Sequence, residues 1–328
     1  YQDILAYLEA ILRVYNRHGR RDNKYKARIK ILVKALGVDA FREKVEAEFE
    51  LLKGGSLTLD AAYVEKMAQY FTKPAYEAAE NLPQVLVDAL DDKTFKRWYQ
   101  RNVNEHMQTG YAIVTVNTKE TARAPGDVSD YELEQLADLA DRYCFGQIRS
   151  THDQNFVLAD VRQDQLPELY ATLKSLGFAD PTIGLINDII CCPGGDFCAL
   201  ANAKSIPIAE SIQRQFDDLD YVFDIGELEL NISGCMNACG HHHVGNIGIL
   251  GVDKKGEEFY QIQLGGNSGL NASLAKVLGP ALTPEEMPSA IQTLIDVFLE
   301  HRQNDERFID TYERIGIAPF KERIYAKS

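Results

Sequence analysis

The sequence has no apolar run of about 18 residues, the length that a membrane-spanning helix needs. Its first ten residues, YQDILAYLEA, lack the basic and apolar stretches of a signal peptide. Positive charge is also scarce, since 35 Lys and Arg face 49 Asp and Glu and give a net charge of -14. An acidic surface repels phosphate backbones. We therefore expect a soluble, cytoplasmic protein whose partners are neither a membrane nor nucleic acid.

The 328 residues contain no short-period repeat, no low-complexity tract and no G-x-G-x-x-G nucleotide-binding motif. A solenoid is thereby excluded, and a nucleotide cofactor is not indicated. Hydrophobic residues make up 45% of the chain, which is enough for more than one folded domain.

Residues 1–99 show a helical pattern interrupted by glycine and proline, with no strong strand signal. The apolar positions that repeat with the 3.6-residue period of a helix are Leu5, Leu8, Ile11, Leu12 and Tyr15. Because the chain opens on Tyr1 within this pattern, we expect it to be part of a longer protein. We predict a helical segment over residues 1–99.

Residues 100–180 change to a mixed pattern. YAIVTV (111–116) predicts a strand, and Ser129-x-x-Glu132 is a capping box that opens a helix. The stretches CFGQIRS and NFVLADV predict two more strands, and LPELYATLKSLGF a second helix. The order βαββα is typical of a ferredoxin-like α+β unit.

Residues 181–328 predict a second α/β unit. The strand ELELNIS leads into Cys235, and NIGILGV and EEFYQIQL form a hairpin. A long amphipathic helix over 284–301 follows. The whole chain is therefore predicted to be an α+β protein with three parts, at residues 1–99, 100–180 and 181–328.

Clustered cysteines in a cytosolic chain are more often metal ligands or nucleophiles than disulfides. The six cysteines are Cys144, Cys191, Cys192, Cys198, Cys235 and Cys239. We interpret Cys144, in a predicted strand, and Cys191, at the end of an apolar run, as buried thiols.

The other four form two ligand pairs, Cys192-x5-Cys198 and Cys235-x3-Cys239. Four thiolates in two loops enclose either a zinc ion or an iron–sulfur cluster. The spacing favours a cluster, because a cluster is larger than one ion and tolerates wider gaps. Glycines near the cysteines let backbone N–H groups approach sulfur: Gly194, Gly195, Gly234 and Gly240. A non-enzymatic protein stabilised by zinc or a cluster stays an alternative.

Three stretches, CPGGDFC (192–198), ISGCMNACGHHHVGNIGILG (232–251) and FYQIQLGGN (259–267), resemble the C-terminal half of the nitrite and sulfite reductases that carry sirohaem and a 4Fe–4S cluster. The resemblance covers nearly the whole chain. It implies the nitrite/sulfite reductase fold, with a ferredoxin-like unit beside a cluster and sirohaem domain. The cluster ligands that it implies are Cys192, Cys198, Cys235 and Cys239, with Cys239 also bridging to the sirohaem iron.

The resemblance also implies a substrate site. RRDNKYKARIKILVKALG (20–37) is similar to the stretch that supplies two substrate-facing cations, here Arg28 and Lys30. Arginine offers a rigid fork to an oxyanion, whereas lysine is a compact charge that polarises oxygen and passes a proton. Some of the other cations of this stretch are expected to neutralise sirohaem carboxylates, from among Arg20, Arg21, Lys24 and Lys26. The alternative is a solvated helix face, and Arg17, Lys24 and Lys34 are interpreted in this way.

GQIRSTHDQN (146–155) resembles the R-x-T-x-x-Q strand that lines the sirohaem in this family. The cofactor contacts expected from the resemblance are Arg149, Thr151, Gln154, Asn155, Asn237 and Asn267. Asn237 is also a common type of turn residue. His241, His242 and His243 are expected to be loop residues rather than a metal site, because consecutive side chains point in different directions.

The function that the resemblance implies is the six-electron reduction of sulfite to sulfide in sulfur assimilation. The electrons would come from a separate ferredoxin or flavoprotein. Lys30 favours sulfite, although Arg28 stands where many sulfite reductases have lysine. Reduction of nitrite to ammonia is the alternative. The N-terminal half of the family's proteins would lie upstream of Tyr1 and supply one wall of the sirohaem pocket.

Overall fold

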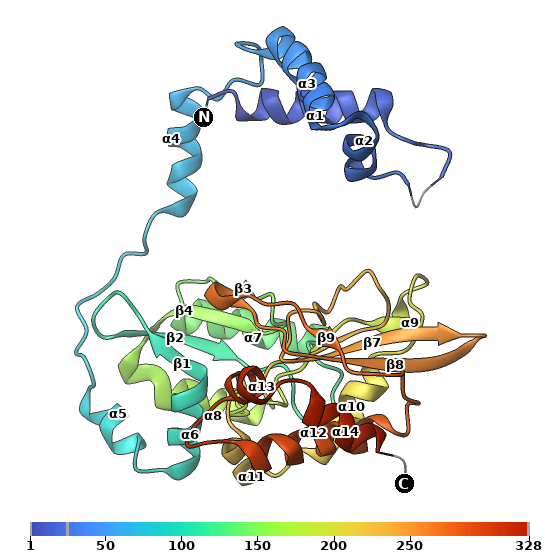
Figure 1. Ribbon diagram of the computed structural model, residues 1–328. Helices are drawn as coiled ribbons and strands as arrows, with labels where there is room; N and C mark the ends of the chain where they lie inside the picture. The colour runs from blue at the N-terminus through green and yellow to red at the C-terminus, as the bar shows by residue number, and fades with distance from the viewer. Residues whose placement is uncertain (1, 24–25, 327–328) are drawn as a thin grey trace. The chain divides into compact units, whose positions relative to one another are not determined.

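The computed structural model describes residues 2–23 and 26–326 and divides the chain into two compact units, with the boundary between Tyr76 and Glu77 (Figure 1). Within these ranges no helix combines the length and the apolar character needed to cross a membrane.

Unit 1 is helical, in agreement with the helical pattern of its sequence. Its α-helices are α1 (Ile4–His18), α2 (Ile29–Leu36), α3 (Val38–Leu52) and α4 (Ala61–Ala68), and the 3₁₀ turn η1 (Gln69–Phe71) follows them. The core is small: Ala10, Val14 and Val45 are buried, and partly buried aromatic rings surround them.

The buried face of helix α1 is not the face that carries its leucines. Ala6, Ala10 and Val14 are its buried residues. Leu8 and Leu12, in contrast, are 49% and 57% exposed. The helical period was predicted correctly, but the buried face was not. The smaller residues form the contact with α3 because they let the two helices approach closely.

An ion pair reinforces the contact between α1 and α3. Glu48, on α3, is buried and accepts hydrogen bonds from Arg17 (2.5 Å) and Arg13 (3.3 Å) on α1. Both arginines lower the pKa of the Glu48 carboxyl, and the hydrogen bond from Arg17 is the largest cause. The interpretation of Arg17 as merely solvated was therefore wrong.

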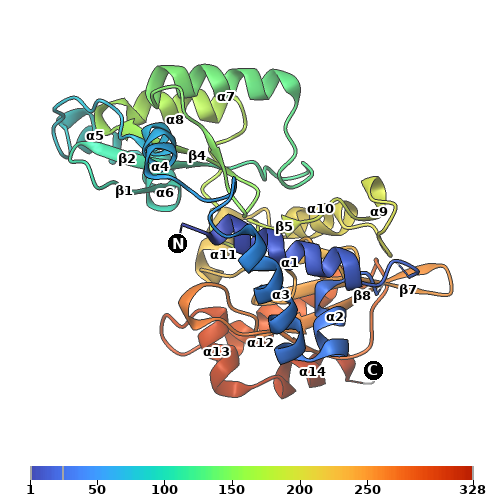
Figure 2. The same cartoon turned by 90° about the horizontal axis from the view of Figure 1, so that it is seen from above.

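The first part of unit 2 contains a four-stranded antiparallel sheet in the order β1-β2-β4-β3. The strands are β1 (Val103–Glu105), β2 (Tyr111–Val116), β3 (Arg149–Ser150) and β4 (Phe156–Arg162). Helices α7 (Asp130–Tyr143) and α8 (Leu166–Ser175) lie beside each other in Figure 2. The predicted βαββα order is present, with β1 as an additional edge strand, and Ser129 and Glu132 form the predicted capping box.

Two helices from the predicted N-terminal segment pack on this sheet unit. They are α5 (Gln84–Ala89) and α6 (Lys93–Asn102). Leu86, Phe95 and Trp98 are buried in one core with the strands and with α7 and α8. The Trp98 indole lies 5.1 Å from the Tyr170 ring. The stretch 1–99 that the sequence presents as one helical part is thus distributed over both units.

The second part of unit 2 contains a five-stranded sheet in the order β5-β6-β7-β8-β9. The strands are β5 (Ile190–Cys191), β6 (Leu230–Ser233), β7 (Ile247–Lys254), β8 (Glu257–Leu264) and β9 (Lys276–Val277). Strands β5, β6 and β7 are parallel, whereas β7, β8 and β9 are antiparallel. The predicted hairpin corresponds to β7 and β8.

Six helices accompany this sheet. They are α9 (Gly194–Phe197), α10 (Ile206–Gln215), α11 (Leu219–Ile225), α12 (Met287–His301), α13 (Phe308–Ile315) and α14 (Ala318–Tyr325). Figure 1 shows α12 and α14 below the hairpin of β7 and β8. The predicted long helix is α12, and it contributes Ile291, Leu294 and Phe298 to the core of this part.

A pair of substitutions in α5 tests whether this helix belongs to the core of unit 2. Leu86 is fully buried, whereas the neighbouring Val85 is 48% exposed. Leu86→Ala should lower the free energy of unfolding by about 2–5 kcal/mol, because it leaves a cavity in a packed core. Trp98 is the only tryptophan, so its fluorescence reports unfolding of this core. Val85→Ala is the matched control, and an equal effect of both variants would contradict the packing of α5.

Candidate functional site

One cysteine of each pair lies at the carboxyl end of one of two neighbouring parallel strands. Cys192 directly follows β5, and Cys235 lies two residues beyond the end of β6. Cys191 stands opposite Ile232 in the strand register, and the Cys192 N–H donates to the Ile232 carbonyl (3.1 Å). Ligand sites in open α/β sheets occur at this edge. The strand pairing therefore brings together two loops that are far apart in the sequence.

Gly234 joins the two cysteine loops. Its N–H donates to the Cys192 sulfur (3.1 Å), and its carbonyl accepts from the N–H groups of Asn202 (2.9 Å) and Ala203 (3.1 Å). A Cβ atom at position 234 would lie 2.6 Å from the Ala203 carbonyl oxygen. Only glycine fits at this position, because the two backbones approach so closely.

The other ligand candidates lie further along these loops. Helix α9 is a single turn, and the Cys198 N–H that ends it donates to the Gly194 carbonyl (2.9 Å). All four thiols are free; Cys235 is buried, Cys192 and Cys198 are half-buried, and Cys239 is exposed. Cys239 is therefore the most accessible of the four sulfur atoms.

One contact at the cysteines fits an iron–sulfur cluster. Backbone N–H groups directed at sulfur help to set the potential of such a cluster. The Gly234 N–H is directed at the Cys192 sulfur, and all four thiols are free. Among the described residues, no three His, Cys, Asp or Glu side chains are grouped so that they could hold one metal ion.

Apolar side chains are exposed around the cysteines. Phe197 is 82%, Leu200 68% and Met236 83% exposed, and they flank Cys198 and Cys235 in the sequence. Exposed apolar groups next to a ligand set are typical of a site that a large, mostly apolar cofactor covers. The surroundings of the cysteines thus fit a tetrapyrrole as well as a cluster.

The remaining two cysteines have different surroundings. Cys144 ends helix α7 rather than lying in a strand as predicted, because Tyr143 and Cys144 continue the buried face of that helix. Its sulfur accepts the Asp160 N–H (3.2 Å). Burial raises the pKa of both the Cys144 and the Cys191 thiols. Both are therefore neutral thiols near pH 7.

Two residues of the stretch 146–155 that were predicted to contact the cofactor form hydrogen bonds with β5 and with the segments near it. The Gln154 side-chain amide donates to the Cys191 carbonyl (2.8 Å) and accepts from the Cys191 N–H (2.7 Å). Asn155 is buried, donates to Asp188 (3.0 Å) and accepts from the Thr118 N–H (3.2 Å). The structure thus joins both side chains to other parts of the protein.

The other residues predicted to contact the cofactor lie nearer the surface. Arg149 is exposed on β3, and the Thr151 hydroxyl accepts from the Asn155 N–H (3.1 Å). Asn237 is exposed in the turn between Cys235 and Cys239. Asn267 donates to the Asn271 carbonyl (3.0 Å). The roles of these four residues stay predictions.

Arg28 and Lys30 lie in unit 1, at the start of α2. Arg28 is the N-cap residue of this helix, and both side chains are exposed. In unit 1 as described, neither of them forms an ion pair, whereas Arg20 binds Asp22 (2.7 Å). No acidic residue lies in the first turn of α2, so two cations stand at the positive end of a helix dipole. This arrangement is favourable only when an anion is bound.

Three other cations of this stretch were expected to neutralise carboxylates. Arg21 donates to Asn16 (3.0 Å) and lies over the Tyr15 ring, and Lys26 is exposed. Lys24 lies outside the described residues. The neutralising role of this group stays a prediction.

The three consecutive histidines differ in their surroundings. His241 is exposed, whereas His242 is buried, and burial lowers the pKa of His242 to about 4. Within the described chain, its Nδ1 has no hydrogen-bond partner. The imidazole of His242 is consequently neutral at pH 7.

Unit 2 contains several cavities of about 140 to 450 Å³, and two of them bear on where a cofactor could bind. One, of about 450 Å³, has both apolar and acidic walls, and its ionisable lining residues are His152, Asp153, Asp188, Glu229 and His241. Burial raises the pKa of the Glu229 carboxyl. The described lining includes no Lys or Arg, so the charge of this cavity is unsuitable for the carboxylates of a tetrapyrrole.

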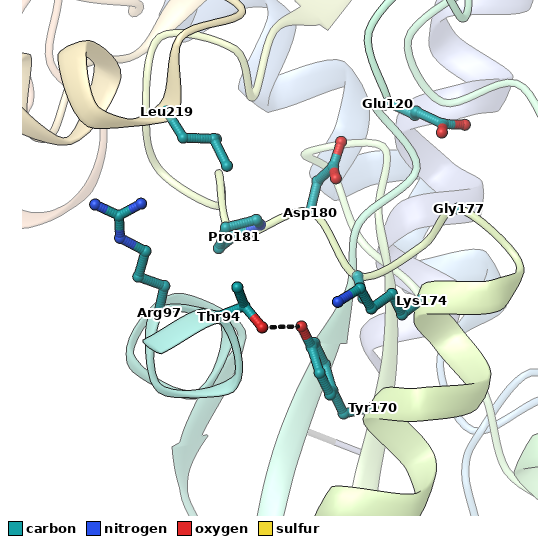
Figure 3. Close-up of a pocket in the computed structure, with 10 residues that line it drawn as sticks. Thr94, Arg97, Glu120, Tyr170, Lys174, Gly177, Asp180, Pro181 and Leu219 are labelled. Carbon is teal, nitrogen blue, oxygen red and sulfur yellow. Dashed lines mark hydrogen bonds between the residues drawn. The ribbon is translucent and has the colours of Figure 1, made fainter. Parts of the chain in front are cut away.

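The other cavity, of about 230 Å³, lies between α6, α8 and α11 (Figure 3). The Tyr170 hydroxyl donates to the Thr94 hydroxyl (3.2 Å) on one side, and Arg97 and Leu219 line the other. None of the predicted site residues lines these two cavities, whereas Asn267 lines a smaller one of about 140 Å³ together with Asn246 and Arg307. The cysteine loops, rather than these cavities, are therefore the candidate site.

Comparison with known families supports this assignment. The sequence profile described as "Nitrite and sulphite reductase 4Fe-4S domain" matches residues 1–53 and 185–328. The profile described as "Nitrite/Sulfite reductase ferredoxin-like half domain" matches residues 107–176. The chain therefore belongs to the nitrite and sulfite reductase family, whose cofactors are sirohaem and a 4Fe–4S cluster.

Relatives with two different names resemble the chain to a similar degree. It is 27% identical over 309 residues to sulfite reductase (ferredoxin) 2 of Mycolicibacterium paratuberculosis, covering 91% of this chain and 49% of the relative. It is 28% identical over 319 residues to the assimilatory ferredoxin-dependent nitrite reductase of Haloferax mediterranei, covering 94% and 49%. The chain thus spans about half the length of these relatives.

Among solved structures, the chain is similar to the NirA protein of Mycobacterium tuberculosis. The TM-score is 0.65 at 25% identity, and the match covers 97% of this chain and 53% of that protein. The similarity supports the predicted fold class.

Two features of the site escaped the analysis of the sequence. One is the pairing of Gln154 with the backbone of Cys191, for which the motif gives no signal. The other is Lys119, which is fully buried and binds Asp188. Lysine is rarely buried, so nothing in the sequence around Lys119 points to this role.

Alkylation kinetics test the division of the cysteines into two classes. After removal of iron with a chelator, iodoacetamide at pH 8 should modify Cys239 fastest, since it is exposed. Cys144 and Cys191 should react only after unfolding, because burial raises their pKa and the thiolate is the nucleophile. Peptide mass spectrometry gives the rates. Modification of Cys191 at the rate of Cys239 would refute the division.

Proposed function

We propose that this chain is the cluster-bearing part of an assimilatory sulfite reductase, which reduces sulfite to sulfide with six electrons. The observation that carries the proposal is the joining of the two cysteine loops through Gly234, whose backbone N–H is directed at the Cys192 sulfur, with all four thiols free. Family membership supports the same assignment.

In this proposal, four thiolates hold the cluster: Cys192, Cys198, Cys235 and Cys239. Cys239 faces the sirohaem, in keeping with its exposure. When bound, the two cofactors supply the electrons and the iron at which the substrate is reduced. Cytoplasmic location remains part of the proposal.

Arg28 and Lys30 are proposed to act on the substrate. The Arg28 guanidinium binds an oxyanion through its planar fork, while Lys30 polarises an oxygen that leaves as water and transfers a proton to it. Their exposure, their lack of ion pairs in the described part of unit 1 and the helix N-terminus support this role.

The carboxylates of the sirohaem are proposed to be bound by polar side chains of unit 2 and by cations of unit 1. In unit 2 these are Arg149, Thr151, Gln154, Asn155, Asn237 and Asn267. We also propose that a further N-terminal half completes the pocket, because the chain spans about half of its relatives.

Reduction of nitrite to ammonia is the second candidate. It is supported by the nitrite reductase of Haloferax mediterranei, which is as similar to the chain as the sulfite reductase is. The names of both relatives include ferredoxin, which supports ferredoxin as the electron donor. A zinc protein without enzymatic activity has less support, since the matching family is described by its 4Fe-4S domain.

An assay with both anions distinguishes these functions. The purified protein is given reduced ferredoxin with sulfite or nitrite, and sulfide and ammonia are measured. We expect sulfide formation with the higher kcat/KM. Higher kcat/KM for nitrite would establish the second candidate, and zinc without iron or acid-labile sulfide would overturn both.

A neighbouring pair of cysteine variants tests the cluster assignment. Cys192→Ala should lose iron, acid-labile sulfide and all reductase activity, because one cluster ligand is removed. Cys191→Ala removes a buried thiol one position away and should retain the cluster. Equal cofactor loss in both variants would show that the loop, rather than the Cys192 ligand, was affected.

Variants in α2 test the substrate cations. Arg28→Ala and Lys30→Ala should each lower kcat/KM by about 100-fold, the usual cost of losing one group that stabilises a developing oxyanion. Lys34→Ala, an exposed lysine at the other end of the same helix, is the control. The sirohaem spectrum should stay unchanged. Full activity of the Arg28 and Lys30 variants would exclude them from the substrate site.

A further inference from the structure

The strand that leads into Cys192 is an edge strand of only two residues. One edge of β5 pairs with β6, and the Cys192 N–H continues this pairing to the Ile232 carbonyl (3.1 Å). On the other edge, the N–H and carbonyl of Cys191 both bind the Gln154 side-chain amide (2.7 and 2.8 Å). One amide group thus takes the place of a missing neighbouring strand.

The backbone at Gln154 is held in an uncommon conformation. Its φ angle is +60°, in the left-handed region that is unfavourable for residues other than glycine. The Gln154 carbonyl accepts from the Thr118 hydroxyl (2.5 Å), and its N–H donates to the Thr151 carbonyl (3.3 Å). Gly126 packs against it so closely that a Cβ atom there would lie 2.9 Å from the Gln154 Cβ. Several contacts therefore fix the direction of this side chain.

A buried network next to Gln154 fixes the same loop to the second part of unit 2. The Lys119 ammonium, which is fully buried, binds Asp188 and the Asp153 carbonyl. Asp188 also accepts from Asn155 (3.0 Å) and from the Gly184 N–H (2.9 Å). Removing one partner from such a network leaves a buried charge unpaired, which is strongly destabilising. Movement of the Gln154 loop away from β5 is thereby opposed.

We propose that Gln154 is a positioning residue for the iron–sulfur cluster, acting through the backbone of Cys191 on the sulfur of Cys192. The two hydrogen bonds fix β5, and β5 fixes the distance between the Cys192 sulfur and the Gly234 N–H (3.1 Å). The inference rests on the proposed role of Cys192 as a cluster ligand. It assigns to Gln154 an effect on the reduction potential.

The direction of that effect follows from charge. Reduction adds negative charge to a cluster and its thiolates, and an N–H group directed at sulfur stabilises that charge. Hydrogen bonds to sulfur are among the factors that set cluster potentials. Loss of the Gln154 amide should loosen β5, lengthen the contact between Gly234 and Cys192, and shift the cluster potential to a more negative value.

Gln154→Gly is the most informative variant. It removes both hydrogen bonds, and glycine adopts the left-handed backbone conformation at no cost, so the loop itself is not strained. Gln163→Ala is the matched control, because Gln163 lies in the same sheet unit and binds the Leu82 N–H (2.7 Å) and the Tyr111 carbonyl (3.2 Å), away from the cysteines.

The measurement is a redox titration of the cofactor-loaded protein, followed by electron paramagnetic resonance of the reduced cluster and accompanied by thermal unfolding. We expect a more negative midpoint potential and an altered signal for Gln154→Gly only. An unchanged potential and signal, with a loss of Tm no different from that of Gln163→Ala, would reduce Gln154 to a structural role and overturn the inference.

Gln154→Asn serves as the conservative variant and as the reserve if the glycine variant yields no folded protein. Asparagine is neutral and tolerates the left-handed backbone conformation, but its shorter side chain cannot keep both hydrogen bonds to Cys191. Its potential should lie between those of the wild type and Gln154→Gly, or below the wild type if measured alone. A wild-type potential would overturn the inference. If the wild-type protein itself holds no cluster, the proposed function fails, which is a distinct result.

Discussion

The contacts of the Gly234 backbone are the interaction on which the candidate site depends. Its N–H is directed at the Cys192 sulfur, while its carbonyl is shared by the N–H groups of Asn202 and Ala203. One peptide position therefore connects the loop after β5 with the loop after β6. Because no side chain fits there, the connection is made entirely by backbone atoms, whose positions are set by the pairing of the two strands. The arrangement of the thiols is thus a consequence of sheet geometry.

The ferredoxin-like unit contributes to the same site although it contains none of the four cysteines. Gln154 covers the free edge of β5, and the buried group of Lys119, Asp188 and Asn155 joins the two sheets of unit 2. A buried ammonium is costly to desolvate, and here a carboxylate and a backbone carbonyl offset that cost. Such a network permits few relative orientations of its partners, so it specifies one docking of the two sheets.

Much of this architecture could be predicted from the sequence because it rests on local signals. The capping box at Ser129, the hairpin of β7 and β8, and the four candidate ligand cysteines are each visible as short patterns. What could not be predicted depends on tertiary packing. The leucines of α1 have the stronger hydrophobicity, yet its alanines form the seam with α3.

The helical position of Cys144 and the contacts of Gln154 with Cys191 could not be predicted, for the same reason. Cys144 stands in an apolar stretch that fits a strand, but the end of α7 extends into that stretch. The motif around Gln154 indicates a polar site without specifying what its amide contacts, and only the fold brings it to Cys191. Local patterns reveal the chemical types of the residues, whereas long-range pairing decides which of them meet.

The long separation of β5 and β6 in the sequence has a consequence for biosynthesis. Cys192 and Cys235 come together only when these strands pair, and three helices lie between them in the chain. Closing such a loop costs entropy that no local contact offsets beforehand. A growing polypeptide on the ribosome therefore lacks the full set of proposed cluster ligands until β6 and the loop after it have emerged. If the four cysteines hold the cluster as proposed, delivery of iron and sulfide follows translation of this region.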